Sequence, residues 1–399
     1  MAANEARSET RRKASRYVVP VAVAGVAAAT IGLVPALAAS GDPDLPEITA
    51  QQLIEKIAAS DTQTLSGTFR ISTDLGLPAL GGLASGLGGG SGSASADPSE
   101  KLTELVSGTH TLRVAADGPE RQRLTLLDGS DEYSLIHNGD DVWGYDSKSN
   151  EVFHEKGAAG APEADKELPG TPKELADEVL KAAGDTTSIT VGGTAKVAGR
   201  DAYQLVIKPK QAGSTVESVK IAVDASTGTP LKFTLSSVEG GKPVVDAGFT
   251  KVDFGRPAAS EFTFEAPKGA KVTEGAAEKG PKGSGDDLPE GFEDGLGGLG
   301  KGFGGLGDLA GGGTGPNVIG EGWTAIASFD TGAPAPKTDE APKELQGFLD
   351  SFGDKVTGTF GSGTVFKTKL VNALLTDDGK VYVGAVTKDA LVKAADAAK

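Results

Sequence analysis

The sequence of 399 residues contains no cysteine. This absence excludes disulfide bonds, thiolate nucleophiles, cysteine-ligated zinc and iron–sulfur clusters. It also excludes a lipid anchor on an N-terminal cysteine. Histidine is nearly as scarce, because the chain has only His110, His137 and His154. They fall on three different predicted strands without metal-ligand spacing, so we expect packing or solvent contacts and no metal site.

Positive charge is in deficit, since the formal net charge is −16. So acidic a surface repels phosphate backbones, and no basic stripe offsets the repulsion, so we expect no nucleic-acid partner. Apolar residues make up 38% of the chain, whereas glycine and proline number 58 and 21. The excess of glycine and proline is concentrated in a few stretches, which indicates ordered segments separated by flexible ones.

Common catalytic motifs are missing: there is no Gly-x-Ser-x-Gly, P-loop, His-Glu-x-x-His or dinucleotide fingerprint. Acidic residues cluster between Asp286 and Asp294, but without the ligand order of a calcium loop, so a solvated acidic linker explains them better. We therefore predict no catalytic residues and no cofactor, and expect a binding protein rather than an enzyme.

The amino terminus carries an export signal. Four basic residues between Arg11 and Arg16 precede an uncharged run from Tyr17 to Gly41, which contains Ala36-Leu37-Ala38. This order is typical of a signal peptide over residues 1–38, cleaved after Ala38. An uncleaved membrane anchor is the alternative, because an apolar stretch of about 20 residues can also span a bilayer. Either way, the mature chain is expected outside the cytoplasm, secreted or tethered to the outer face of the membrane.

Periodicity predicts the elements of residues 39–275. A capping box of Thr49 and Gln52 begins a helix at about 50–59, and Thr171, Pro172 and Glu174 begin a second, which ends at Gly184. Alternating strands follow each helix. We expect them at 65–72, 110–114, 124–126, 133–137, 142–145 and 151–155, then at 189–191, 202–207, 219–223, 231–235, 244–254 and 262–264. A Gly-, Leu- and Ser-rich loop interrupts the first group at 75–98.

The remainder divides into a linker and a second module. Residues 276–317 are Gly-rich, charged and without periodicity, which predicts a flexible linker. Residues 318–399 read as a small α+β module. Its expected elements are a strand at 322–329, a short helix at 342–352, strands at 366–375 and 380–386, and a final helix at about 388–398. We expect the two sides of the linker to move independently.

Three groups of short sequence motifs, taken in their order along the chain, resemble those of a known superfamily. The first is Pro119-x-x-x-Arg123 with Ile136-His137-Asn138-Gly139-x-x-Val142-Trp143-x-Tyr145-Asp146. The second is Val197 to Tyr203, with Val223-Asp224 and Thr229-Pro230-Leu231. The third is Glu261-Phe262-Thr263-Phe264, then Pro267-x-Gly269-Ala270-x-Val272. Over about residues 47–275 the chain resembles the periplasmic lipoprotein-carrier superfamily, which includes LolA-like carriers, LppX-like lipid carriers and RseB-like regulators of anti-sigma factors.

The resemblance implies an α+β fold: an antiparallel, unclosed half-barrel wrapped around two helices, followed by the small C-terminal α+β module. An apolar face of such a sheet would form a groove for acyl chains. The residues that we expect to line it are Phe69, Ile71, Leu112, Val114, Arg123, Leu126, Trp143 and Tyr145. Arg123 matches the arginine associated in the carriers with the closed cavity or the ligand head group, although a surface arginine would also fit.

Two functional hypotheses follow, and a third stays open. The protein holds acyl chains of a lipid or lipoprotein, or it is an RseB-like envelope regulator that binds an anti-sigma factor or another membrane protein. The second module and the linker favour the regulator. A purely structural surface protein would bind neither.

Overall fold

The computed structural model describes residues 43–76, 96, 108–156, 184–275, 317–332 and 353–398. Several predicted segments lie outside these residues: the expected signal peptide, the second helix beginning at Thr171, most of the 75–98 loop, the linker over 276–316 and the whole 342–352 helix. Within them, no helix is long and apolar enough to cross a bilayer.

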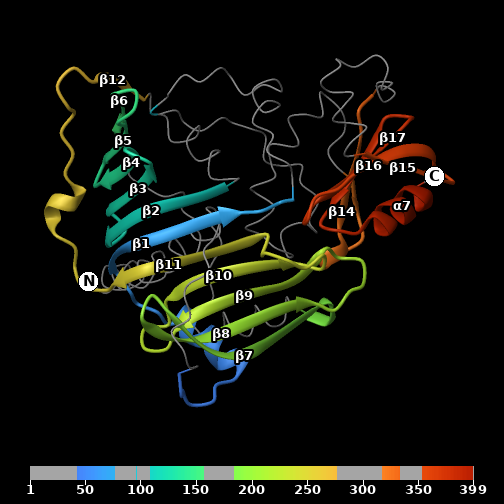
Figure 1. Cartoon of the computed structure of the whole chain (residues 1–399), viewed down its shortest axis with the longest axis horizontal. Helices are drawn as coiled ribbons and strands as arrows, with labels where there is room; N and C mark the ends of the chain where they lie inside the picture. The colour runs from blue at the N-terminus through green and yellow to red at the C-terminus, as the bar shows by residue number, and fades with distance from the viewer. Residues whose placement is uncertain are drawn as a thin grey trace, which may run out of the picture.

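A 12-stranded open sheet dominates the described chain (Figure 1), in the order β12-β6-β5-β4-β3-β2-β1-β11-β10-β9-β8-β7. All its pairs are antiparallel except β12 with β6. The strands of its first half are β1 (Thr64–Thr73), β2 (Gly108–Asp117), β3 (Arg121–Asp128), β4 (Asp131–Asn138), β5 (Asp141–Asp146) and β6 (Glu151–Lys156). Those of the second are β7 (Thr187–Val197), β8 (Arg200–Pro209), β9 (Val216–Asp224), β10 (Pro230–Ser237), β11 (Val245–Asp253) and β12 (Lys271–Glu274).

This mostly-β, unclosed sheet confirms the coarse part of the predicted half-barrel. Each strand expected from alternation before residue 254 is present. The prediction of a strand at 262–264 is wrong: the 3-10 helix η2 (Ala259–Phe262) ends there, and Phe262 is 1% exposed. Another 3-10 turn, η1 (Gly184–Thr186), precedes β7.

The helix α2 (Ala50–Ala58) begins at the predicted cap. Gln52 N donates to Thr49 Oγ1, and Thr49 N donates to Gln52 Oε1, which completes the capping box. Its Leu53 and Ile54 are buried against Tyr203, Leu205 and Val223 of β8 and β9. The turn between β9 and β10 approaches the helix so closely that a Cβ on Gly228 would lie 2.3 Å from Lys56 O.

A six-stranded sheet forms the C-terminal module, in the order β13-β14-β18-β17-β16-β15. Its elements are β13 (Asn317–Ile319), η4 (Gly322–Thr324), β14 (Ile326–Asp330), β15 (Gly353–Gly358), β16 (Gly361–Phe366), β17 (Asn372–Thr376), β18 (Lys380–Gly384) and α7 (Lys388–Ala397). The pair β17–β18 and the last helix are as predicted. The strand expected over 366–375 is instead the end of β16, a connecting loop and β17, while the strand expected from Gly322 starts only at Ile326.

The loop between β16 and β17 packs the module against the large sheet. Leu370 is buried in a cluster with Val219, Leu235 and Val245 of β9, β10 and β11. Backbone bonds run from Thr215 N to Ala385 O, 2.9 Å, and from Thr387 N to Gly213 O, 2.7 Å. Trp323 Nε1 donates to Thr187 Oγ1 at 2.7 Å. This packed interface opposes the independent movement expected from the linker.

Candidate functional site

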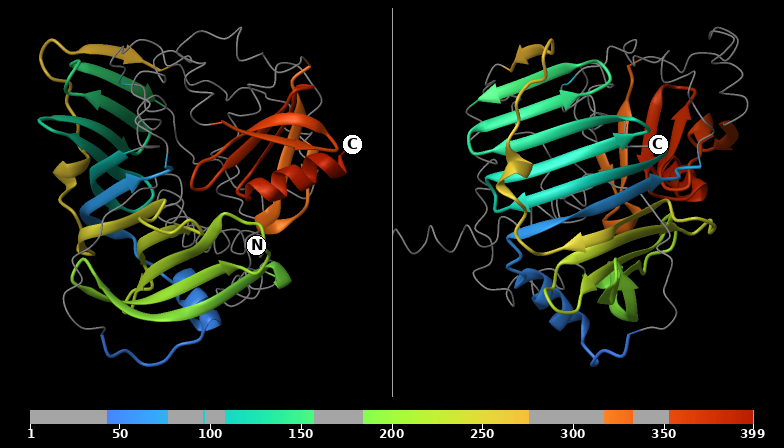
Figure 2. Two further views of the ribbon diagram at one scale, coloured as in Figure 1. Left: turned by 45° about the vertical axis from the view of Figure 1, so that its right-hand side comes forward. Right: turned by 60° about the vertical axis from the view of Figure 1, so that its left-hand side comes forward.

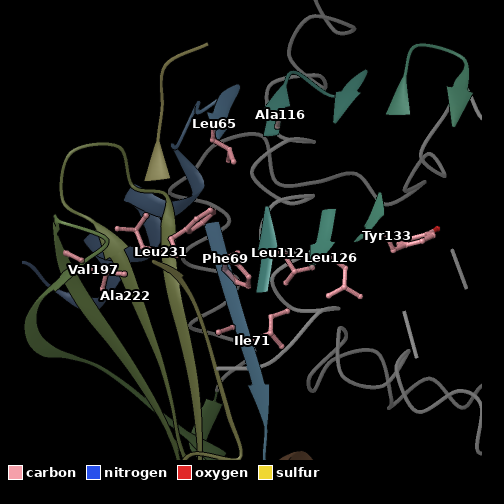
Figure 3. Packing of buried hydrophobic residues seen from close by; sticks show 13 residues of the cluster. Leu65, Phe69, Ile71, Leu112, Ala116, Leu126, Tyr133, Val197, Ala222 and Leu231 are labelled. Atoms are coloured by element: carbon pink, nitrogen blue, oxygen red, sulfur yellow. The ribbon is translucent and has the colours of Figure 1, made fainter. Parts of the chain in front are cut away.

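The pairing register separates the large sheet into two faces of different chemistry. Phe69 of β1 pairs with Leu112 of β2, and Leu112 pairs with Leu126 of β3, so these three side chains share one face. We call this the apolar face; Figure 3 shows the three residues side by side. Arg123 and Thr125 alternate with Leu124 and Leu126 and therefore lie on the opposite face.

The apolar face continues across both halves of the sheet. Phe249 of β11 pairs with Phe69, and their rings meet edge to face with centroids 5.1 Å apart. The register carries the same face through Phe233 and Ile221 to Leu205. A buried cluster includes much of this face and comprises Leu65, Phe69, Ile71, Leu112, Ala116, Leu126, Tyr133, Val197, Ala202, Ala222, Leu231, Ala247 and Phe249, with Val114, Leu124 and Leu135 partly buried against it. Two of its members, Ala202 and Ala222, alternate with Leu205 and Ile221 and so lie on the other face.

Contacts with described residues already cover parts of this face. The second half bears α2 and the interface cluster around Leu370. In the first half, Tyr133 donates from its hydroxyl to Ala96 O at 3.0 Å. A Cβ on Gly144 would lie 2.5 Å from the same oxygen, so glycine is required for this approach.

The opposite face is crossed by a segment that we call the strap, residues 254–270, which joins β11 to β12. Figure 2 (right) shows it passing over the strands of the first half. Arg256 Nε lies 3.0 Å from Asp117 Oδ1, Arg123 Nη1 donates to Glu261 O at 3.2 Å, and Phe262 is buried. Phe264 packs at 5.5 Å from Trp143 and 5.6 Å from Tyr145, measured between ring centroids.

The eight predicted groove residues therefore do not line one surface. Phe69, Ile71, Leu112, Val114 and Leu126 lie together on the apolar face. Arg123, Trp143 and Tyr145 lie on the strap face, where Ser134 pairs with Tyr145 and Ile136 with Trp143. Arg123 also donates to Thr125 Oγ1 and Ser134 Oγ, both at 3.3 Å, so its described hydrogen bonds lie on the strap face.

Sequence reasoning missed a polar cluster at the end of the strap. His154 of β6 stacks on Trp143 with centroids 3.7 Å apart, and its two ring nitrogens meet carboxylates of Asp141 and Glu274 at 2.9 and 2.8 Å. The β5–β6 register pairs Trp143 with His154 and could have indicated the stack, whereas the approach of Glu274 has no local signal. Among the described residues, no group of His, Asp and Glu is arranged to hold a metal ion.

An ion pair joins the C-terminal module to the large sheet. Lys369 Nζ lies 2.6 Å from Asp74 Oδ2, and Lys369 N donates to Leu75 O at 2.8 Å. The hydrogen bond from Lys369 holds the pKa of Asp74 below its usual value. These two contacts attach the C-terminal module to the chain immediately after β1.

Comparison with known proteins fits this architecture. Residues 102–266, from the approach to β2 through most of the strap, match the family model of the MucB/RseB N-terminal domain. This matched stretch, less than half of the chain, is similar to that domain. No curated protein matches the chain.

Solved structures show weaker likeness. The MucA/MucB complex of Pseudomonas aeruginosa has 16% identity over 87% of this chain and 96% of that chain, with a TM-score of 0.37. An uncharacterized conserved protein of Thermus thermophilus has 13% identity over 56% and 98%, with a TM-score of 0.30. A LolA superfamily protein of Nitrosomonas europaea has 12% identity over 55% and 99%, with a TM-score of 0.19.

Proposed function

We propose that this protein binds acyl chains of a lipid or lipoprotein outside the cytoplasm, against the apolar face of the first half of the sheet. The observation that carries the proposal is the row of paired apolar residues Phe69, Leu112 and Leu126, extended by Val114, Leu124 and Leu135. Each buried methylene contributes about 0.8 kcal/mol, so about ten contribute ~8 kcal/mol before association costs. That free energy suits reversible capture.

The test uses the exported chain, purified without detergent. We expect acyl lipid to be retained in native mass spectrometry, and a fluorescent fatty acid to bind and be displaced by it. Val114→Trp should weaken uptake at least about tenfold, because one added indole occupies the volume of several methylenes. Arg113→Trp is the matched control, since Arg113 is the neighbouring residue on the opposite face, with a side chain 59% exposed, and it should bind as the native protein does.

Three results would count against acyl-chain binding: absence of retained lipid, no uptake of the fluorescent acid, or equal effects of the two tryptophan variants. Thermal unfolding of both variants must first show that each is folded. The groove role of Arg123, Trp143 and Tyr145 receives no support from their position under the strap. We therefore restrict the proposed ligand contacts to Phe69, Ile71, Leu112, Val114 and Leu126.

A second candidate function is regulation by binding an anti-sigma factor or another membrane protein. Two observations favour it: the matched family model is that of MucB/RseB, and a second folded module packs against the first. The test is a pull-down of the extracytoplasmic segment of any anti-sigma factor encoded beside this gene. The full chain should bind this segment. Loss of binding in Leu370→Asp, with binding retained in Lys355→Asp at an exposed site, would support a regulator that needs both modules. Lipid capture without such binding would favour a carrier.

A further inference from the structure

His154 is held from three sides at the edge of the large sheet. Its ring lies nearly parallel to that of Trp143, with an interplanar angle of 13°. Nε2 lies 2.9 Å from Asp141 Oδ1 on β5, and Nδ1 lies 2.8 Å from Glu274 Oε2 on β12. The side chain of His154 is 13% exposed, whereas that of Glu274 is 69% exposed. The histidine thus links the β5–β6 hairpin to an exposed terminal strand.

The protonation state of the ring decides how many of these contacts are hydrogen bonds. A neutral imidazole has one N–H donor, while an imidazolium has two. Ionised carboxylates only accept, so the imidazolium alone can donate to both Asp141 and Glu274. In the neutral ring, one nitrogen lone pair would face a carboxylate oxygen at hydrogen-bond distance, which is repulsive.

The other charged and titratable groups near the ring do not replace the hydrogen bonds that His154 makes to Asp141 and Glu274. Lys156 follows His154 by two residues on the same face and pairs in register with Asp141. Tyr145 lies on that face two residues after Trp143. On β12, Lys271 pairs with Glu151 at 2.8 Å, but its side chain is 75% exposed, so the pair stabilises the strand little.

β12 has few other contacts, so side-chain interactions matter for its attachment to the sheet. It is a four-residue edge strand whose residues are all exposed, and Val272 is 45% exposed. Among the described strands, its main-chain neighbour is β6 alone, in the one parallel pairing of the sheet. Because β12 ends the strap and precedes the segment that leads to the C-terminal module, its attachment fixes the position at which the chain leaves the sheet.

We propose that His154 is a pH-sensitive fastener of β12. The strand is held to β6 when the ring is protonated in mild acid, and the attachment weakens as pH rises and one donor is lost. Histidines ordinarily change charge between about pH 5 and about pH 8, the range that an extracytoplasmic protein meets. Loosening uncovers the edge of β6 and frees the end of the strap from Trp143.

The experiment measures backbone hydrogen exchange of residues 271–274 in the full chain at about pH 6 and about pH 8, corrected for the intrinsic pH dependence of exchange. We expect about tenfold lower protection at the higher pH, as the loss of one charge-assisted bond implies. In a Trp323→Phe background, Trp143 is the one tryptophan left of two. Its fluorescence should rise over the same pH range, because a stacked imidazolium quenches indole emission.

Three variants make the result decisive. His154→Gln should show low protection at both pH values, whereas His137→Gln, on the other face of β4, should respond as the native chain does. Glu274→Gln keeps the histidine but removes the charge on β12, so its pH response should shrink; this variant decides the matter if His154→Gln does not fold. Equal native protection at both pH values, or a full response in His154→Gln or Glu274→Gln, would overturn the proposal.

Discussion

Asp224 combines deep burial with a full set of donors at the turn between β9 and β10. It is 1% exposed, and Arg200 Nε and Nη2 lie 2.5 and 3.1 Å from its two oxygens. Ser226 N, Thr227 N and Thr227 Oγ1 also donate to it. Burial acts to raise the pKa of Asp224, but the hydrogen bonds from Arg200 and Thr227 outweigh it and hold the pKa below its usual value.

Asp224→Asn should therefore lower the free energy of unfolding by about 2–3 kcal/mol at neutral pH, because it leaves Arg200 without its counter-charge. A depressed carboxyl pKa stabilises the fold above the unfolded value of about 4 and ceases to do so as pH falls through the lower folded value. The difference between native and variant should shrink accordingly in urea denaturation at acid pH. Asp201→Asn, which breaks the exposed pair with Lys196, should cost under about 1 kcal/mol. Similar costs for both variants would contradict this account.

Single residues also show how far the sequence could predict the site. Alternation identifies Phe69, Ile71, Leu112 and Leu126 as members of one buried face, because each strand repeats the pattern. It also shows that Trp143 and Tyr145 share a face, but not which one. The short Asn138-Gly139 turn pairs Asn138 with Asp141, and that register already places Trp143 opposite Ile136 instead of Leu135. The resemblance named Arg123 by its motif and gave no information on the face of the sheet that it occupies.

At the level of elements, the strap is the feature that local sequence patterns could not predict. Phe262 and Phe264 alternate as in a strand, yet they pack onto a sheet face and pair with no strand of the described chain. Phe262 is 1% exposed, η2 lies against β3 and β4, and the chain around Phe262 turns as a 3-10 helix. Tertiary packing overrides the propensity of two phenylalanines for a strand.

Phe262→Ala should lower the free energy of unfolding by about 3 kcal/mol, as expected for a buried aromatic side chain. Guanidinium denaturation measures the change. Val272→Ala, at an exposed position of β12 just after the strap, should cost under about 0.5 kcal/mol. A small effect of the phenylalanine substitution would mean that the strap does not depend on this anchor.

At the scale of the molecule, the two modules are joined by a packed interface as well as by the chain. Limited proteolysis should cut within residues 276–316, whose Gly-rich composition favours cleavage, but the pieces should co-elute in gel filtration. Leu370→Asp should let them separate, because it buries a charge among Val219, Leu235 and Val245. Lys355→Asp, at an exposed site, should not. Separation of the native pieces on cleavage would instead support two independent domains, the organisation that the sequence indicates.

The position of β1 between β2 and β11 has a consequence for how the chain reaches this state. β2 to β6 pair with their sequence neighbours, as do β7 to β11, whereas Thr250 Oγ1 donates to Thr68 O across 182 residues. Such distant pairing slows folding, because the connecting chain must be ordered before the contact stabilises it. When the chain is synthesised from its amino terminus, the backbone N–H and C=O groups on one edge of β1 stay unpaired until β11 has been made. Over that interval this edge can pair with other chains, so we expect aggregation during folding to fall when β11 is completed quickly or when a chaperone covers the edge.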